Sequence, residues 1–474
     1  MVVLVKVSVG VNRRHINAGL NWLIYFTIIF FNWQFSIAIM ASDWYNEFIN
    51  RHYIKKKGDL IALFRYRAAG GISSEAAIGR IASESSSGTW TTLTKLPRLL
   101  PKVKAYAYKY DSRTVEVAYP PIIFENGSVP ALMSAIGGNI FGMKALDSLR
   151  LQDAELPSEF VNSFKGPVYG KDAIKKIFKK KSGPITSVVP KPKLGYTARE
   201  HAEKVAYAIW KGGMDCVKDD ENLTDQKFNQ FDERVKWVAK FRDKAEKETG
   251  NVKDAFLNVT SPDLRELERR IKLVHDNGFK YFMIDVVVSG FTAVQTACNI
   301  ARDYKMAIHG HRAMHAMFTR NESHGMSMLF LAKLMRLMGV DQLHIGTVVG
   351  KLTGSQREIV ATKEMILAGA DGVGEISGLR MPQKWGKIKP MLPVASGGLH
   401  PGLLPEVFGI YGTTDLVLQL GGGTQGHPMG IEAGARAAMQ AIDAYKEGIS
   451  LSEYAKKHRE LAAALKKWNV MKPI

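Results

Sequence analysis

The chain of 474 residues has only two cysteines, Cys216 and Cys298, and both lie in apolar stretches. So few cysteines exclude a disulfide framework and a cysteine-rich zinc site. We expect both residues to be buried, reduced thiols. Reduced thiols are typical of a reducing compartment, so the sequence predicts a cytoplasmic protein.

The chain also lacks the features of a nucleic-acid reader, although its net charge is +20. Such a charge admits nucleic acid, anionic lipid or phosphorylated metabolites as partners. The densest basic clusters, Lys55–Lys57 and Lys175–Lys181, are short and have few aromatic neighbours. Without a recognisable nucleic-acid-binding fold around them, we interpret both as solvated surface and expect no nucleic-acid partner.

Only one run is apolar enough to suggest a membrane span, and it covers Leu20–Met40 after a few basic residues. It is about long enough to cross a bilayer. However, Asn21, Asn32 and Gln34 interrupt it, no clean A-x-A cleavage site follows, and the sequence changes character at Met40. Two interpretations remain: residues 1–39 are an extension before a true start at Met40, or they are a membrane anchor.

Residues 40–165 predict a small α+β domain with an antiparallel, ferredoxin-like sheet. Alternating apolar positions and turn residues indicate strands over 59–68, 103–110, 114–119 and 146–155. Helices are expected over 73–85 and 129–137. A chain of this length favours a second domain, for which residues 166–474 remain.

Residues 166–474 alternate short apolar strands with amphipathic helices. A capping box, Thr197 to Glu200, begins the first helix, and Pro262 precedes a later one with Leu264, Leu267, Ile271 and Val274 on one face. Eight such units predict a (β/α)8 barrel. A doubly wound sheet is the alternative, but no glycine-rich nucleotide motif follows the first strand. The strands are expected over 185–189, 214–217, 255–259, 281–287, 306–308, 342–345, 392–395 and 416–420.

Unusual polar residues follow six of these eight strands, where barrel enzymes carry their reactive groups. A single acidic run is usually a solvated loop, and a single histidine is usually structural. Six such strand ends in one chain are hard to reconcile with that explanation. The groups are Lys191 to Lys193; Lys218 to Asn222; His309, His311, Arg312 and His315; His344 with Lys351; Ser396 to His400; and Gly421 to Thr424.

These residue types point to a magnesium site beside anion-binding loops. Asp220 and Glu221 offer the hard oxygen ligands that Mg²⁺ prefers. Glycine runs after the last two strands let backbone N–H groups approach a phosphate, and Arg312 and the lysines add positive charge. Together they suggest a substrate with two phosphates. Lys218 stands within the acidic run, where composition explains it only as a counter-charge.

Several motifs together resemble the large chain of ribulose-bisphosphate carboxylase/oxygenase, from about Met40 to the end of the chain. The sequences of these motifs are most similar to those of the archaeal-type (form III) enzymes, which have large subunits only. The motifs are GGMDCVKDDEN (212–222), KPKLG (191–195), HRAMHA (311–316), GTVVGKL (346–352), ASGGLH (395–400), QLGGGTQGHP (419–428), SESSSGTWTTL (83–93) and GGNIFGMKAL (137–146).

The resemblance implies carboxylation of ribulose 1,5-bisphosphate to two 3-phosphoglycerate, with competing oxygenation by O₂. It also implies that CO₂ converts Lys218 into a carbamate, which binds one Mg²⁺ together with Asp220 and Glu221. Lys191 matches a lysine that protonates the final carbanion, His311 an acid–base histidine, and Lys351 a mobile-loop lysine that holds the incoming CO₂. Substrate-binding positions match Lys193, Arg312, His344, Ser396, Gly397, Gly398, Gly421 and Gly422.

Four further residues, Glu84, Thr89, Trp90 and Asn139, match positions that a neighbouring subunit contributes. A homodimer is therefore the expected minimal unit, with higher homo-oligomers possible and no small subunit. The archaeal-type enzymes are associated with salvage of nucleotide ribose, which becomes the expected pathway.

Two departures from the family pattern remove hydroxyl groups near the substrate. Val188 and Val189 stand where a threonine is common, and Ile345 stands where serine or threonine is common. They put substrate affinity and CO₂/O₂ discrimination in doubt more than the reaction type. Two alternatives remain: a carboxylase-like enolase or isomerase acting on a related phosphorylated ketose, and a non-catalytic, membrane-tethered scaffold.

Overall fold

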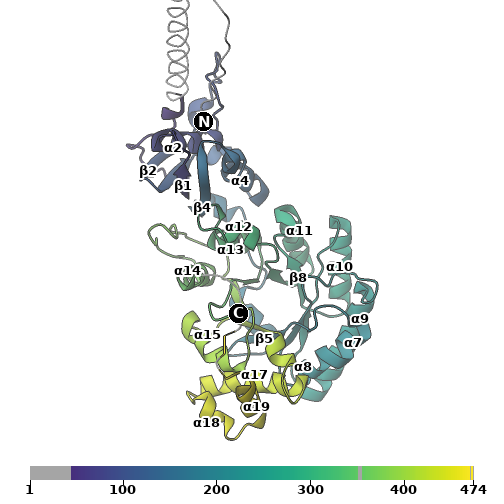
Figure 1. The fold of residues 1–474 in the computed structure, drawn as a ribbon. Helices are drawn as coiled ribbons and strands as arrows, with labels where there is room; N and C mark the ends of the chain where they lie inside the picture. Colours follow the sequence, from purple (N-terminus) through teal and green to yellow (C-terminus); the bar gives the residue numbers. More distant parts are fainter. Residues whose placement is uncertain (1–43, 351–354, 470, 473–474) are drawn as a thin grey trace, which may run out of the picture.

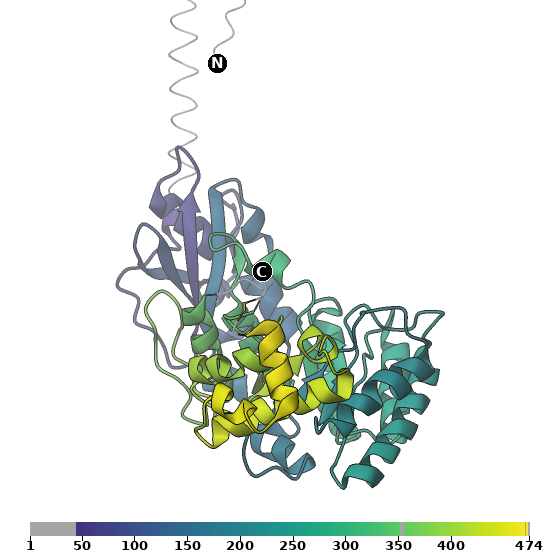
Figure 2. The same cartoon turned by 60° about the horizontal axis from the view of Figure 1, so that its bottom comes forward.

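The computed structural model describes residues 44–350, 355–469 and 471–472, and it contains two sheets (Figure 1). The apolar segment 1–39, Met40 and Lys351 lie outside the described residues. An N-terminal unit and the C-terminal helices lie at opposite ends of the molecule in Figure 1, and Figure 2 brings the C-terminal helices to the front. Among the described residues, no helix is long and apolar enough to cross a membrane.

The N-terminal unit is a five-stranded sheet with the order β10-β4-β1-β3-β2. The central strand β1 (Leu60–Ala68) pairs antiparallel with β3 (Thr114–Tyr119) and β4 (Leu146–Glu155), and β2 (Tyr106–Tyr110) pairs with β3. Helix α2 (Ser74–Glu84) packs on β1 and β2. Its first turn is capped by the Ser73 hydroxyl, which accepts from Ala76 N. The remaining helices are α3 (Leu100–Val103), η1 (Pro121–Ile123), α4 (Val129–Ile136), η2 (Asn139–Gly142) and α5 (Ser158–Asn162).

The sequence predicted a purely antiparallel sheet, but this sheet is mixed. The two-residue strand β10 (Gly325–Met326) comes from the barrel half of the chain and runs parallel to β4. Two buried side chains of β4 reinforce the junction. Arg150 donates to the carbonyl oxygens of Thr319 and Asn321, and Asp153 forms an ion pair with Lys333 of α13 (Met328–Met338).

The second sheet is an almost closed parallel barrel of eight strands, so the barrel prediction is confirmed and the doubly wound alternative is wrong. The order is β7-β6-β5-β13-β12-β11-β9-β8. The gap in the barrel lies between β7 and β8. Two backbone hydrogen bonds among the described residues link the segment after β7 to β8: Met283 N donates to Leu257 O, and Val259 N donates to Met283 O. The strands are β5 (Ile185–Val188), β6 (Cys216–Lys218), β7 (Asp254–Phe256), β8 (Tyr281–Asp285), β9 (Ala307–His311), β11 (Gln342–His344), β12 (Leu392–Ser396) and β13 (Val417–Leu420).

Helices surround the barrel and cover its apolar strands. The predicted capping box at Thr197 and Glu200 is confirmed. Leu264 is 43% exposed, whereas Leu267, Ile271 and Val274 of the same helix are buried, so the predicted apolar face is one residue too wide. The helices are α6 (Gly170–Ile177), α7 (Ala198–Glu200), η3 (His201–Ala206), α8 (Tyr207–Lys211), α9 (Phe231–Thr249), α10 (Leu264–Asp276), α11 (Gly290–Asp303), α12 (Ala316–Thr319), α14 (Gln356–Leu367), η4 (Pro401–Leu403), α15 (Leu404–Tyr411), α16 (Gly422–Gln425), α17 (Ile431–Lys446), α18 (Leu451–Ala455) and α19 (Arg459–Trp468).

Two strand boundaries differ from the prediction in a way that matters for the site. Strand β8 ends at Asp285 rather than at residue 287, and β9 continues to His311 rather than stopping at residue 308. Register explains both, because Asp285 pairs with His311 at the end of the β8–β9 ladder. The two free cysteines are buried, as expected.

Candidate active site

The polar strand ends gather on the carboxyl-terminal rim of the barrel. Because the strands are parallel, their carboxyl ends meet at one rim, where a barrel builds its site. Lys191 follows β5, Lys218 ends β6, His311 ends β9, His344 ends β11 and Ser396 ends β12. Gly421 and Gly422 follow β13.

Two carboxylates and two lysines form the most highly charged part of the rim. Asp220 is buried, and its Oδ2 lies 2.6 Å from Lys191 Nζ, while Glu221 Oε1 lies 2.5 Å from Lys193 Nζ. Burial alone would raise the pKa of Asp220, but hydrogen bonds involving Glu221 and Lys191 lower it below its usual value. Asp220 is therefore anionic and can bind a cation.

Lys218 lies near these carboxylates and is almost completely buried. Its ammonium donates to the backbone oxygen of Asp219 at 2.7 Å. Burial lowers its pKa below 10.5, although the nearby carboxylates, Asp285 foremost, oppose that shift. A lysine with a lowered pKa supplies more neutral amine, which is the nucleophilic form.

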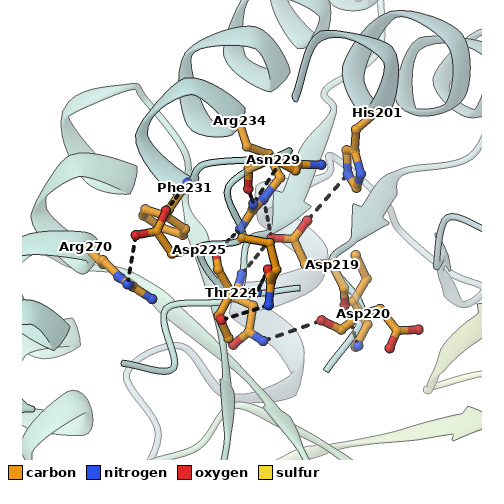
Figure 3. A network of polar contacts seen from close by, with 12 residues as sticks. His201, Asp219, Asp220, Thr224, Asp225, Asn229, Phe231, Arg234 and Arg270 are labelled. Atoms are coloured by element: carbon orange, nitrogen blue, oxygen red, sulfur yellow. Dashed lines mark hydrogen bonds and ion pairs between the residues drawn. The ribbon is translucent and has the colours of Figure 1, made fainter. Parts of the chain in front are cut away.

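Asp219, next to Lys218, anchors the loop after β6 (Figure 3). Its carboxylate accepts from Arg234 Nε at 3.0 Å and from the backbone N–H of Asn258, also at 3.0 Å. Arg234 is fully buried and also donates to the backbone oxygens of Thr224 and Asn229. This network fixes the backbone that carries Lys218 and the two metal-binding candidates.

His201 approaches Asp219 from the opposite side, with Nε2 3.4 Å from Oδ1 (Figure 3). Burial lowers its pKa to about 4, so the imidazole is neutral at neutral pH. Sequence reasoning missed both His201 and Arg234. Each lies on a helix outside the motifs, where it resembles an ordinary surface residue of an amphipathic segment.

His311 is held by a carboxylate that the sequence reasoning also missed. Its Nδ1 lies 2.8 Å from Asp285 Oδ1, and its Nε2 lies 3.9 Å from Glu221 Oε2. Burial lowers the pKa of His311, an effect that Asp285 partly opposes. If Nδ1 carries the hydrogen and donates it to Asp285, the lone pair of Nε2 faces Glu221. The signal for Asp285 was its position at a strand end, hidden because the predicted strand ran two residues further.

His344 and Ser396 form a second pair on the rim. His344 Nδ1 lies 2.6 Å from Ser396 Oγ, and its Nε2 lies 2.8 Å from Nε2 of His309. Gln342 contacts the far nitrogen of His309 at 2.8 Å. The structure thus links two predicted site residues to a histidine and a glutamine in the barrel core.

Arg312 and the glycines are the candidate anion-binding groups predicted from the sequence. Arg312 is buried beside a cavity of about 120 Å³, and burial lowers its pKa to about 10, so it stays cationic. Gly397 and Gly398 have φ of +117° and +85°, which favour glycine. A Cβ on Gly421 would lie 3.4 Å from Lys191 Cε, whereas one on Gly422 would meet open space.

Four predicted site residues do not reach this rim within one chain. Glu84, Trp90 and Asn139 are exposed on the N-terminal unit, Trp90 by 80%, and Thr89 is half-buried there. Within the part of the chain that the structure describes, none of the four hydrogen-bonds to a group of the barrel rim; the backbone oxygen of Thr89 accepts from Trp44 Nε1.

The donors on the rim fit Mg²⁺ if Lys218 supplies a further anionic group. Among the described residues, no cluster of three or more His, Cys, Asp or Glu side chains could hold a metal. Asp220 and Glu221 provide two carboxylates, and the amine of Lys218 would provide a third oxygen donor only after modification. Val188, Val189 and Ile345 are buried next to the rim, and none of these three side chains carries a hydroxyl.

A parallel barrel whose rim carries a carboxylate pair, a buried lysine and several cations defines an enzyme of the (β/α)8 class with an anionic substrate. The chain belongs to the ribulose bisphosphate carboxylase large-chain family. The family's catalytic-domain model matches residues 171–468, and its N-terminal-domain model matches residues 47–160.

Archaeal relatives cover nearly the whole chain. A ribulose bisphosphate carboxylase of Pyrococcus abyssi is 46% identical over 92% of this chain and 100% of its own length. A dimeric archaeal Rubisco from Hyperthermus butylicus is 48% identical, with a TM-score of 0.86 over 90% of this chain and 100% of that one. An octameric Rubisco from Pyrococcus horikoshii, crystallised with sulfate, is 44% identical, with a TM-score of 0.84 over 90% and 98%.

Proposed function

We propose that the chain adds CO₂ to ribulose 1,5-bisphosphate to give two 3-phosphoglycerate, with O₂ as a competing substrate. The observation that carries this proposal is the buried Lys218, whose pKa is lowered, placed among the carboxylates of Asp220, Glu221 and Asp285. The resemblance to the ribulose bisphosphate carboxylase family implies that this lysine is activated by CO₂.

In the proposed activation, the neutral amine of Lys218 forms an N–C bond with CO₂ and loses one proton to solvent, leaving an anionic carbamate. The carbamate, Asp220 and Glu221 would then hold one Mg²⁺. When bound, Mg²⁺ supplies a Lewis acid that polarises the substrate carbonyl. Lys191 and Lys193 now pair with the two carboxylates and would be released to bind the substrate.

The remaining rim residues have proton-transfer and binding roles in this proposal. The carbamate of Lys218 removes the C3 proton, and His311, oriented by Asp285, exchanges protons nearby. Lys191 protonates the final carbanion, and Lys351 holds the incoming CO₂. The phosphates bind to Lys193, Arg312, His344, Ser396, Gly397, Gly398, Gly421 and Gly422, whose backbone and cationic groups suit anions.

The proposed active unit is a homodimer, because Glu84, Thr89, Trp90 and Asn139 match positions that a neighbouring subunit contributes in the family. The dimeric and octameric relatives support a homo-oligomer without a small subunit. We also propose that residues 40–165 and 166–474 are the two domains. We propose a role in nucleotide ribose salvage from the resemblance to the archaeal-type enzymes, and the two buried thiols support a cytoplasmic location.

A single assay tests the proposed reaction. The purified chain from Met40 is preincubated with bicarbonate and Mg²⁺, then given ribulose 1,5-bisphosphate and labelled bicarbonate. We expect labelled 3-phosphoglycerate, and none from Lys218→Ala. Exchange of the C3 proton without labelled product would favour the alternative, an enolase or isomerase of a related phosphorylated ketose, and would refute the carboxylase proposal.

A further inference from the structure

Four hydrogen-bonding side chains run in a line from the barrel core to the rim. The line begins at Gln342, passes through His309 and His344, and ends at the hydroxyl of Ser396, with successive distances of 2.8, 2.8 and 2.6 Å. Gln342 and His309 are fully buried, His344 is nearly so, and Ser396 is half-buried. The line therefore connects a core amide to a hydroxyl that can face the substrate.

Both histidines in this line are neutral. Burial lowers the pKa of each well below 6.5. A neutral imidazole carries one N–H and one acceptor nitrogen. Because the two Nε2 atoms are 2.8 Å apart, one ring must donate and the other accept. All hydrogen bonds of the line therefore donate either toward Ser396 or toward Gln342.

The amide of Gln342 distinguishes the two directions. If its N–H donates to His309, then His309 donates to His344, His344 donates to Ser396, and the hydroxyl hydrogen of Ser396 stays available. In the reverse direction the amide of Gln342 is turned so that its oxygen accepts from His309, the hydroxyl hydrogen of Ser396 is used on His344, and both amide hydrogens of Gln342 are left unpaired. The first direction leaves Gln342 Oε1 and one amide hydrogen without a partner among the described residues. The two directions therefore differ in whether the carbonyl oxygen or a second N–H group is unpaired, and a buried carbonyl oxygen tolerates this better.

We propose that Gln342 is a positioning residue that directs this line so that Ser396 keeps its hydroxyl hydrogen for an anionic group of the substrate. This rests on the proposed function, in which Ser396 binds a substrate phosphate. A hydroxyl hydrogen directed at an anion makes a charge-assisted hydrogen bond. A hydroxyl that donates to His344 instead presents lone pairs to the same anion, which weakens binding.

A double-mutant cycle between Gln342 and Ser396 tests the role. Gln342→Met keeps a similar volume but has no N–H donor. We expect it to raise KM for ribulose 1,5-bisphosphate by roughly 5- to 10-fold, the effect of one hydrogen bond to an anion, with kcat nearly unchanged. In a Ser396→Ala background the same change should leave KM unaltered, because the hydroxyl is already absent.

Gln152→Met is the matched control, since Gln152 is a buried glutamine of β4 whose amide donates to Leu379 O. Its KM should equal that of the unaltered chain. Gln342→Leu repeats the test should the methionine variant fold poorly. An equal KM increase with and without Ser396, or no increase, would overturn the role of Gln342. If the unaltered chain makes no labelled product, the proposed function fails instead.

Discussion

At the scale of single residues, the environment of Lys218 decides how the site is activated. Burial holds the pKa of its ammonium below the ordinary value of 10.5, and four nearby carboxylates oppose that shift. In water the same lysine would be protonated almost completely at neutral pH. Burial therefore favours the neutral, reactive amine, while the carboxylates favour the ammonium.

The lowered pKa of Lys218 predicts the pH dependence of activation. Only the neutral amine reacts with CO₂, and its fraction rises as the pH increases toward the pKa. At a fixed concentration of dissolved CO₂, we expect carboxylase activity to rise with preincubation pH between about 7 and 9. Samples are preincubated at each pH and assayed at a single pH. Activity independent of the preincubation pH would contradict this prediction, and Lys218→Arg should show no activation at any pH.

Asp285 should matter because it holds one nitrogen of His311. We expect Asp285→Asn to lower kcat by at least ~10-fold, and His311→Ala by roughly 10²–10⁴-fold, the range for loss of an acid–base group. Steady-state carboxylation and C3 proton exchange are measured for both variants. Asp303→Asn, a surface change at the end of α11, should leave both rates unchanged. Equal rates in Asp285→Asn and the unaltered chain would show that the 2.8 Å contact has no catalytic role.

At the scale of elements, the buried pair of Asp153 and Lys333 joins the N-terminal sheet to helix α13. Both side chains have no exposed surface. Asp153 also accepts from Met381 N, and Lys333 donates to Ala154 O. Each charge offsets part of the other's desolvation cost, because neither side chain has access to water.

Removing one partner of this pair should be strongly destabilising. We expect Lys333→Met to lower the free energy of unfolding by about 3–5 kcal/mol, because it leaves a buried carboxylate without its cation. The double variant Lys333→Met with Asp153→Asn should recover part of that loss. Urea unfolding measures both, with Lys236→Met on the surface as a control. A single variant as stable as the double variant would contradict the prediction.

Most elements could be predicted from the sequence because their burial leaves a local pattern. The strands Leu392–Ser396 and Val417–Leu420 are short apolar runs between amphipathic helices, and such runs identify buried parallel strands. Strand β10 could not be predicted in this way. Two residues carry no periodicity, and Gly325 pairs with Arg150 only because the chain folds back onto the first sheet.

The site was predictable where its residues lie in compact motifs at strand ends. Asp220 and Glu221 follow a strand directly, so the sequence places them on the rim. Arg234, Asp285 and Gln342 act through contacts between elements that are distant in the sequence. Neither periodicity nor composition reports such contacts, because each residue also fits an ordinary helix or strand position.

At the scale of the whole molecule, the site residues are divided between the two units. The rim of the barrel holds the carboxylates and lysines, while Glu84 and Trp90 are exposed on the N-terminal sheet. Under the dimer proposal, each catalytic centre combines the barrel of one chain with the N-terminal unit of the other.

A mixing experiment tests this division. Glu84→Ala and Lys218→Ala should each be inactive alone. When the two chains are unfolded together and refolded in equal amounts, half of the dimers are mixed, and one site in each mixed dimer is intact. We therefore expect about a quarter of the unaltered activity for a two-fold symmetric dimer. Mixing without refolding is the control. No recovered activity in verified mixed dimers would show that both residues act within one chain.

The short strand β10 also has a consequence for how the protein is made. Strand β4 leaves the ribosome with Arg150 and Asp153 lacking their polar partners, since the acceptors of Arg150 and the lysine that pairs with Asp153 lie 169 or more positions further along the chain. At typical rates of translation that interval is on the order of 10–30 s. Until the middle of the barrel has been synthesised, the first sheet therefore has an open edge at β4 and two charged side chains without their partners.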